Sequence, residues 1–228
     1  MFVTQAAQHV YDALLTLTYP QICVICGHSV EQRRFGVACK ACWSKTQIFT
    51  DDKAICWDRA CESLACVRSV GMYKGTLRES VLLLKRQPYL PRHVEELLLA
   101  AAMQEPLNNS TRVVPVPLHP KRLKTRGFNQ AQILARAVSK ALKLPLDEVS
   151  LRRVSSTEKY RAGLDRKGRR DTVAGAFEVA RPRLVAGENI LLIDDVFTTG
   201  ATVSACAEAL IDAGAPRVYV LTVARAFL

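Results

Sequence analysis

The stretch Ile190-Leu-Leu-Ile-Asp-Asp-Val-Phe-Thr-Thr-Gly-Ala-Thr202 decides the fold that we expect. Its first four residues are apolar and are followed by two adjacent carboxylates, a pattern typical of a buried parallel strand that ends in acidic residues. Small and hydroxylated residues then form a turn, and a helix is predicted from about Ala201. Asp194 and Asp195 are therefore expected at the carboxyl end of a strand, where open α/β sheets bind their ligands.

Alternating strand and helix patterns surround this stretch. Strand patterns cover 69–73, 112–116, 149–154 and 217–224, and helical periodicity covers 75–86, 93–103, 129–142 and 201–213. Such alternation predicts an α/β fold with helices on both faces of a mostly parallel sheet. We divide the chain into residues 1–68, with an amphipathic helix over 4–18 and a metal-binding module, and residues 69–228, the α/β domain.

Composition narrows the class of protein. The chain has 228 residues, of which 49% are hydrophobic and 23% charged, so it can bury a core and wholesale disorder is excluded. No apolar run reaches the ~20 residues that cross a bilayer. Gln5, His9 and Asp12 interrupt the first segment, where a signal peptide would be apolar. We therefore expect a soluble cytoplasmic protein.

The net charge of +11 is unevenly distributed. Residues 1–70 carry 7 Lys and Arg against 6 Asp and Glu, whereas residues 71–228 carry 25 against 15. A basic excess of this kind attracts polyanions such as nucleic acids, nucleotides or pyrophosphates, although basic proteins without such a ligand are common.

Seven of the eight cysteines lie between positions 23 and 66. Four of them form two C-x-x-C pairs with the spacing of a structural, four-thiolate zinc site: Cys23, Cys26, Cys39 and Cys42. Disulfides are the rival explanation, but a reducing cytosol favours bound metal. Cys56, Cys61 and Cys66 lack the C-x-x-C spacing, and we favour buried core positions over metal ligation for these three.

The turn after the acidic pair is suited to a phosphate group. Backbone N–H groups, the Thr198 and Thr199 hydroxyls and the positive end of the following helix can converge on one anion, and Gly200 permits close backbone approach. A ligand that satisfies both this turn and the two carboxylates carries a phosphate near a diol, as a ribose 5-phosphate does. The G-x-x-x-x-G-K-[ST] signature is absent, which disfavours a kinase or NTPase.

This motif resembles the signature of the type I phosphoribosyltransferases. The resemblance implies that Asp194 and Asp195 hold the ribose hydroxyls of phosphoribosyl pyrophosphate and support the positive charge that develops on the sugar. It implies that the residues after them hold the 5-phosphate: Val196, Phe197, Thr198, Thr199, Gly200, Ala201 and Thr202. It also implies Mg²⁺, bridging the ribose hydroxyls and the diphosphate.

A second string, Val114-Pro-Val-Pro-Leu-His-Pro-Lys-Arg-Leu-Lys-Thr-Arg-Gly-Phe-Asn-Gln-Ala131, resembles the hallmark of the ComF family, which includes ComFC-type competence proteins and GntX. With the cysteine module, 71–85 and 175–177, the resemblance covers 20–227. It implies a basic loop in the position of the pyrophosphate loop of the transferases. Lys121, Arg122 and Arg126 of this loop are expected to bind the pyrophosphate. The alternatives are nucleic-acid contact and a merely solvated loop.

Residues 152–170 fit neither a strand nor a helix pattern and carry a net charge of +6. The resemblance aligns this segment with the flexible catalytic loop of the transferases, but Arg161 and Thr172 stand where the family usually has Gln and Asn. Such a loop could close over pyrophosphate or capture single-stranded DNA. Our candidate nucleic-acid contacts are Lys85, Arg86, Lys124, Arg152, Arg153, Lys159, Arg161, Arg166, Lys167, Arg169 and Arg170.

The ComF resemblance implies a protein that binds phosphoribosyl pyrophosphate and single-stranded DNA and assists DNA uptake or processing in natural transformation, alongside uptake or recombination proteins. The alternative is an active phosphoribosyltransferase, which transfers a pentosyl group to an unidentified small acceptor. No residues that would read a purine or pyrimidine edge are evident. A zinc-stabilised scaffold for another protein is a third hypothesis.

Overall fold

The computed structural model describes residues 20–50, 55–56, 64–154 and 175–226. Its main sheet has five strands in the order β1-β2-β7-β6-β3. These strands are β1 (Ile55–Cys56), β2 (Cys66–Met72), β3 (Arg112–Pro115), β6 (Asn189–Phe197) and β7 (Arg217–Arg225). All neighbouring pairs are parallel except β1, which runs antiparallel to β2 at one edge. The predicted α/β fold with a mostly parallel sheet is confirmed.

A second, two-stranded antiparallel sheet consists of β4 (Leu151–Arg153) and β5 (Phe177–Val179). In its register Arg153 lies opposite Phe177. The two strands flank residues 155–174, so the basic segment singled out in the sequence lies, from 155 onward, outside the described residues. The helix expected over 4–18 also lies outside them.

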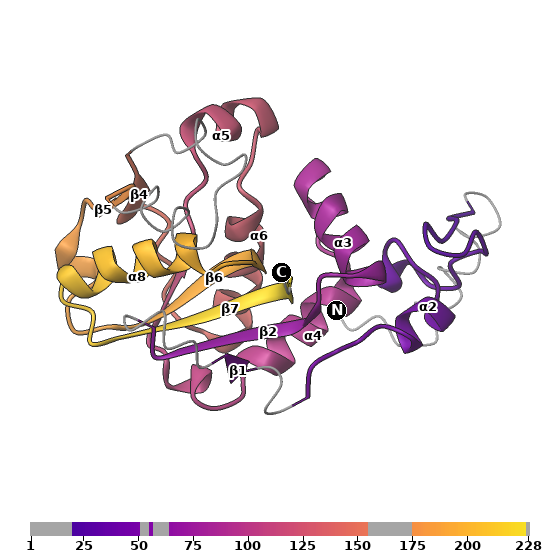
Figure 1. Cartoon of the computed structure of the whole chain (residues 1–228), viewed down its shortest axis with the longest axis horizontal. Helices are drawn as coiled ribbons and strands as arrows, with labels where there is room; N and C mark the ends of the chain where they lie inside the picture. The colour runs from indigo at the N-terminus through magenta and orange to yellow at the C-terminus, as the bar shows by residue number, and fades with distance from the viewer. Residues whose placement is uncertain (1–19, 51–54, 57–63, 155–174, 227–228) are drawn as a thin grey trace, which may run out of the picture.

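Helices cover both faces of the main sheet (Figure 1). They are α2 (Lys40–Ser44), α3 (Gly75–Arg86), α4 (Arg92–Ala102), α5 (Pro120–Arg126), α6 (Gln130–Leu142) and α8 (Ala201–Asp212), with 3-10 turns at Arg33–Phe35, Leu107–Asn109 and Pro182–Leu184. None of the helices in the described part of the chain is long and apolar enough to span a bilayer.

Two hydrophobic clusters lie on opposite faces of the sheet, because successive side chains of a strand point to opposite faces. Leu191 and Ile193 of β6 pack in one cluster with α3, α4, α6 and the cysteine module. Ile190 and Leu192 pack in the other with α8 and the β4–β5 pair. Both faces of the central strands are therefore buried, which explains the continuous apolar run of β6.

Residues 114–131, the second string quoted from the sequence, fold differently from what we expected. We expected a basic loop after β3, but Pro120–Arg126 forms the helix α5. His119 caps its start, with Nδ1 accepting from the Lys121 N–H at 3.2 Å, and Gly127 ends it at a positive φ of 81°. Proline in the first turn and glycine after the last turn are ordinary helix boundaries, so the loop prediction was wrong.

The cysteine module packs directly on the α/β domain. Phe35 and Trp43 belong to the same hydrophobic cluster as Leu98 of α4. Strand β2, which the sequence predicted from Ser69, begins at Cys66 and so spans the proposed division at residue 68. Division of the chain into 1–68 and 69–228 stays a prediction.

Candidate functional site

The acidic pair lies near the carboxyl end of β6, as predicted. The strand continues through Val196 and Phe197, which pair with Ala224 and Arg225 of β7. Asp194 is half-buried and Asp195 is buried. The Asp195 backbone N–H donates to Asp194 Oδ1 at 2.8 Å, which fixes the first carboxylate against the strand.

A cavity of about 200 Å³ opens beside this pair. Four cationic and two acidic side chains line it: Lys85, Arg122, Arg126, Arg153, Asp194 and Asp195. They come from α3, α5, β4 and β6, which are distant in the sequence. The fold therefore assembles a mixed-charge pocket at the end of β6, where open α/β sheets place their ligands.

Two of the cations are held by identifiable partners. Lys85 Nζ lies 3.0 Å from Asp195 Oδ2. Arg126 donates to the side-chain oxygen of Gln130, at the start of α6. Asn129 caps α6 by accepting from the Ala131 N–H, and its amide donates to the Val116 carbonyl at 2.9 Å. These contacts fix the basic side of the cavity relative to β3.

Arg153 approaches from the other face. Its guanidinium carbon lies 5.2 Å from the centre of the Phe177 ring on the paired strand β5, a cation–π contact. Arg153 belongs to the basic segment 152–170 that was singled out in the sequence. Among the described residues of that segment, it is Arg153 that lines the cavity.

Asp194 differs from a free aspartate in its pKa. Burial and the neighbouring Asp195 carboxylate raise the pKa of Asp194 to about 8. Lys85 opposes this shift only in part. A ligand or cation that needs ionised Asp194 therefore displaces a proton near neutral pH.

The turn from Thr198 to Gly200 connects β6 to α8. Gly200 adopts a positive φ of 78°, which favours glycine, and no side chain caps the first turn of α8. Thr202 lines the cavity from that turn. The backbone N–H groups of this helix end thus lie beside the acidic pair, in the arrangement that binds phosphate groups elsewhere.

Other predicted ligands lie away from the cavity lining. Phe197 is 2% exposed and packs in the cluster beneath α8, and Val196 packs against the opposite cluster. Lys121, on α5, is exposed to solvent. Of the candidate nucleic-acid contacts, Arg86, Lys124 and Arg152 are exposed, whereas Lys85 and Arg153 line the cavity. The other six candidates lie outside the described residues: Lys159, Arg161, Arg166, Lys167, Arg169 and Arg170.

The donor set of the cavity fits Mg²⁺. Two adjacent carboxylates supply the hard oxygen ligands that this ion prefers, and cationic side chains beside them suit the phosphates with which it usually arrives. Among the described residues, no hydrogen bond reaches Asp195 Oδ2, which forms an ion pair with Lys85. This oxygen is therefore available to a competing cation.

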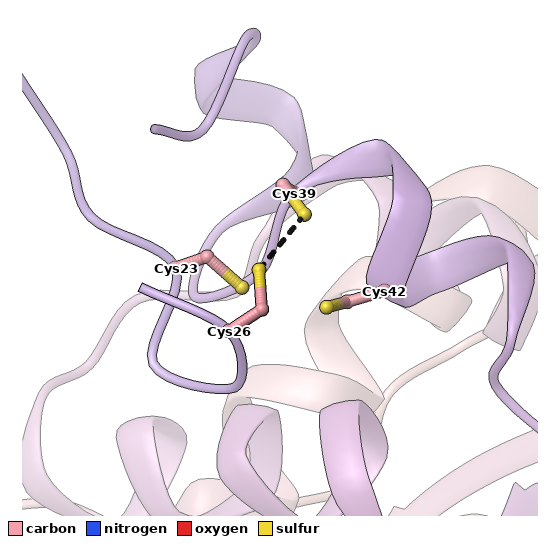
Figure 2. A group of neighbouring side chains, drawn as sticks. All are labelled: Cys23, Cys26, Cys39 and Cys42. Atoms are coloured by element: carbon pink, nitrogen blue, oxygen red, sulfur yellow. Dashed lines mark hydrogen bonds between the residues drawn. The ribbon is translucent and has the colours of Figure 1, made fainter. Parts of the chain in front are cut away.

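The four cysteines of the two C-x-x-C pairs form a second cluster, shown in Figure 2. Cys23 and Cys26 belong to a tight turn in which Gly27 has a φ of 76°, and Cys39 and Cys42 lie at the start of α2 and within it. All four sulfur atoms lie within 4.8 Å of one another and point toward a common centre. The cluster could hold a metal ion, as predicted.

Its geometry suits a tetrahedral ion better than disulfides. Cys26 Sγ and Cys39 Sγ are 3.6 Å apart, far longer than the ~2.05 Å of a disulfide. A tetrahedron with ~2.3 Å zinc–sulfur bonds has edges of about 3.8 Å. His28, next to the first pair, is exposed and is not part of the cluster.

Ionisation of all four thiols would be costly without a cation beside them. Burial and the neighbouring thiols raise the pKa of Cys42 to about 12. Burial opposes ionisation at Cys23 as well, but hydrogen bonds from the backbone of Cys39, Cys26 and Ile25 lower its pKa to about 6. One thiolate therefore forms easily and makes the next more costly, and a bound metal ion would remove that cost.

The remaining cysteines fall into two groups. Cys66 and Cys206 are buried, at 1% and 0% exposure, as expected for core positions. Cys61 lies outside the described residues, and Cys56 lies in β1. The metal-compatible cluster found among the described residues contains neither Cys66 nor Cys206.

The sequence assigned Lys85 and Arg153 to the candidate nucleic-acid contacts because of their charge. The structure places both in the lining of the cavity, and the nucleic-acid assignment stays a prediction. Lys85 comes one residue after buried Leu84, and Arg153 comes two residues after buried Leu151. The burial of these neighbours is seen only in the structure, so the sequence held no signal that would have placed either cation in the cavity.

Comparison with known proteins supports one family, although no family model matches the chain. The chain is 28% identical over 231 residues to DNA utilization protein YhgH of Escherichia coli K12, and the alignment covers 92% of this chain and 99% of that one. It is 35% identical over 115 residues to Competence protein F of Haemophilus influenzae, covering 50% of each chain. It is 35% identical over 102 residues to Competence protein ComFC of Bacillus subtilis, covering 45% and 39%.

These alignments differ in extent. The match to YhgH of Escherichia coli O157:H7, like that to Competence protein F, spans only about half the length of the relative.

Among solved structures, the purine phosphoribosyltransferase from Pyrococcus horikoshii aligns with a TM-score of 0.37 and 14% identity, covering 60% of this chain and 86% of that one. Because this TM-score is low, the description of the fold rests on the strand order of the chain itself.

Three observations indicate the same type of protein. They are the similarity to proteins named for competence, the near full-length alignment with YhgH, and the string 114–131. Over almost its whole length, the chain is therefore similar to the competence and DNA utilization proteins of the ComF type.

Proposed function

We propose that this protein binds phosphoribosyl pyrophosphate with Mg²⁺ at the end of β6, binds single-stranded DNA on its basic surface, and assists DNA uptake or processing during natural transformation. The observation that carries the first part is the cavity, which joins Asp194 and Asp195 with four cations. Relatives named for competence and DNA utilization support the biological role.

Each part of the ligand has a matching group in and beside the cavity. Two carboxylates can accept hydrogen bonds from the ribose hydroxyls, and the α8 terminus after Gly200 can hold the 5-phosphate. Arg122 and Arg126 lie on the basic side, where a diphosphate would be neutralised. Mg²⁺ would supply charge neutralisation between ribose and diphosphate when bound.

Calorimetric titration with phosphoribosyl pyrophosphate, with and without Mg²⁺, tests the ligand. We expect magnesium-dependent binding by the wild type and none by the double variant Asp194→Asn/Asp195→Asn. Lys140→Met is the control, because Lys140 is exposed on α6 and is not among the residues that line the cavity. Absence of binding by folded, zinc-loaded wild type would refute this part.

DNA binding is tested separately with a fluorescent oligothymidine at several salt concentrations. Affinity should fall steeply as salt rises, with a log–log slope of about −0.7 for each phosphate contact. Replacing exposed Lys121 and Lys124 with Gln should make the slope shallower by about 1.4 if both contact phosphates. Salt-insensitive binding, or none, would contradict the proposal.

Zinc is the metal that we propose for the cysteine cluster. Four thiolates in a tetrahedral arrangement form a closed site without an open coordination position, so the ion would be structural. Metal analysis of the purified protein should find about one zinc per chain, and a Cys39→Ser variant should lose it.

Catalysis is a second candidate function for the same cavity. Asp194 and Asp195 lie where they could support positive charge on a ribose. Release of pyrophosphate in the presence of an acceptor would establish transferase activity, whereas binding without turnover would favour a ligand-binding role.

A further inference from the structure

The ion pair between Lys85 and Asp195 joins the last turn of α3 to β6. Asp195 keeps only 8% of its side chain exposed, and Lys85 keeps 29%. A carboxylate this buried needs a nearby cation to balance its charge. Lys85 Nζ, 3.0 Å from Asp195 Oδ2, supplies that cation.

The position of Lys85 is fixed by packing. Leu77, Val81 and Leu84 on the inner side of α3 are 0%, 1% and 2% exposed. They belong to the cluster that packs against β2 and β7. Because the helix backbone is anchored in this way, Lys85 reaches Asp195 with its flexible side chain alone and could change partners without moving the helix.

A second partner for Lys85 is available within the same cavity. Arg122 and Arg126 line the basic side, so an anionic ligand held by them would lie within the pocket that Lys85 also lines. A diphosphate offers several acceptor oxygens to a lysine ammonium. A divalent cation arriving with that diphosphate would in turn need the carboxylate that Lys85 occupies.

We propose that Lys85 is a resident counter-ion that competes with a divalent cation for Asp195, and that it passes to the anionic ligand when metal and ligand enter together. This rests on the proposed function, in which the cavity takes Mg²⁺ with a diphosphate. The arrangement would make metal binding weak in the free protein and strong in the presence of the ligand, because one positive charge replaces another at the same oxygen.

Titration of the zinc-loaded protein with Mn²⁺ alone, followed by the electron paramagnetic resonance signal of free Mn²⁺, tests this competition. Lys85→Met should bind Mn²⁺ at least about tenfold more tightly than wild type, since it removes a unit charge a few ångströms from the metal position. Lys85→Arg keeps the charge and should bind as weakly as wild type. Lys140→Met, an exposed cation on α6, should also match wild type.

A further variant assigns the metal to the carboxylate. Asp195→Asn in the Lys85→Met background should lose the gained affinity. The proposal is overturned if folded Lys85→Met binds Mn²⁺ no more tightly than wild type, or if the gain survives Asp195→Asn. Phosphoribosyl pyrophosphate is absent from these titrations, so its failure to bind wild type would refute the proposed function while leaving the Mn²⁺ comparison intact.

Discussion

The cysteine cluster and the carboxylate cavity are built in opposite ways. The cluster takes its four side chains from residues 23–42 of one short segment, whereas the cavity takes its charged side chains from α3, α5, β4 and β6. The first can be recognised from spacing alone, and the second exists only once the sheet has formed. Local ligand sets are therefore readable in a sequence, and sites assembled from distant segments are readable only in part.

The two regions also differ in what stabilises them. Asp194 and Asp195 lie on β6, whose residues Ile190 to Ile193 are fully buried on both faces. Cys26 and the neighbouring Ile22 and Val24 are exposed and Cys23 is buried, so the first cysteine turn contacts the core on one side only. We infer that this turn depends on its metal more than the cavity does, since the cavity is built on a strand buried on both faces.

The largest expected effect is therefore loss of metal from the cysteine cluster. Cys39→Ser, or a strong chelator, should unfold the module, because structural zinc binding contributes directly to folding. Trp43 is buried and donates from its indole N–H to the Phe35 carbonyl at 2.9 Å. In a Trp57→Phe background, which leaves Trp43 as the one tryptophan, its fluorescence should shift to the red.

Two variants serve as controls for this prediction. His28→Gln changes an exposed residue beside the cluster and should leave both zinc content and the Trp43 signal unchanged. Asp194→Asn/Asp195→Asn should also retain zinc. If chelation leaves the fluorescence and the melting curve unaltered, the module is held by packing alone and the contrast between the two regions disappears.

A smaller effect is expected from single cations around the cavity. Arg126→Met should weaken binding of phosphoribosyl pyrophosphate about tenfold or more, because charge-assisted contacts to phosphate are among the stronger hydrogen bonds. Lys124→Met, on the same helix α5 but exposed to solvent, should leave that affinity unchanged while weakening binding of oligothymidine. Equal losses of phosphoribosyl pyrophosphate affinity in both variants would mean that only net charge matters.

The predictable part of the fold came from strong local patterns. The run at 190–193 predicted the central strand, and the helices at 129–142 and 201–213 were found within one residue of the observed starts. The α5 helix was missed because four cations in a short stretch, with a resemblance to the pyrophosphate loop of the transferases, were interpreted as a loop. Its Pro120 and Gly127 boundaries were present in the sequence but carried less weight than the charge.

The predictable part of the candidate site followed the same rule. Asp194, Asp195 and the four cysteines were identified because neighbouring residues repeat or reinforce the signal. Lys85 and Arg153 could not be assigned to the cavity, since nothing along the chain links them to Asp195. Their role depends on the packing of α3 and on the pairing of β4 with β5, which bring distant residues together.

The third prediction concerns the pH dependence of stability at the cavity. The folded protein holds a proton on Asp194 up to about pH 8, whereas the unfolded chain releases it near pH 4. The unfolded state therefore binds fewer protons between these limits, and the free energy of unfolding falls as pH rises through them. Asp194→Asn should remove this loss and raise the melting temperature by about 3 °C or more above pH 8.

The same variant should show little advantage at the acidic end, where Asp194 is protonated in both states. Asp212→Asn makes the same change in net charge at an exposed residue, the last of α8, and serves as the control. Melting curves measured across this pH range would contradict the assignment if the gap between Asp194→Asn and wild type stayed constant. That outcome would mean that Asp194 is ionised throughout.

The smallest effect concerns His93 of α4, which packs against the cysteine module. Its ring makes edge contacts with Phe35 and Trp43 of the cysteine module, at centroid distances of 5.2 and 4.6 Å. Burial and the nearby Arg34 guanidinium lower the pKa of His93, although Glu96 opposes the shift. The unfolded chain therefore takes up the proton first as pH falls through about 6.5, and stability is lost in that direction.

His93→Phe retains an aromatic ring between the module and α4 but cannot bind a proton. We expect its melting temperature to fall less than that of wild type between about pH 7 and pH 6, by roughly 1–2 °C. Exposed His28→Gln should track wild type, which separates His93 from the general effect of acid on the thiolates. If His93→Phe and wild type lose stability in parallel, acid acts through the metal site, and His93 contributes to the junction only by packing.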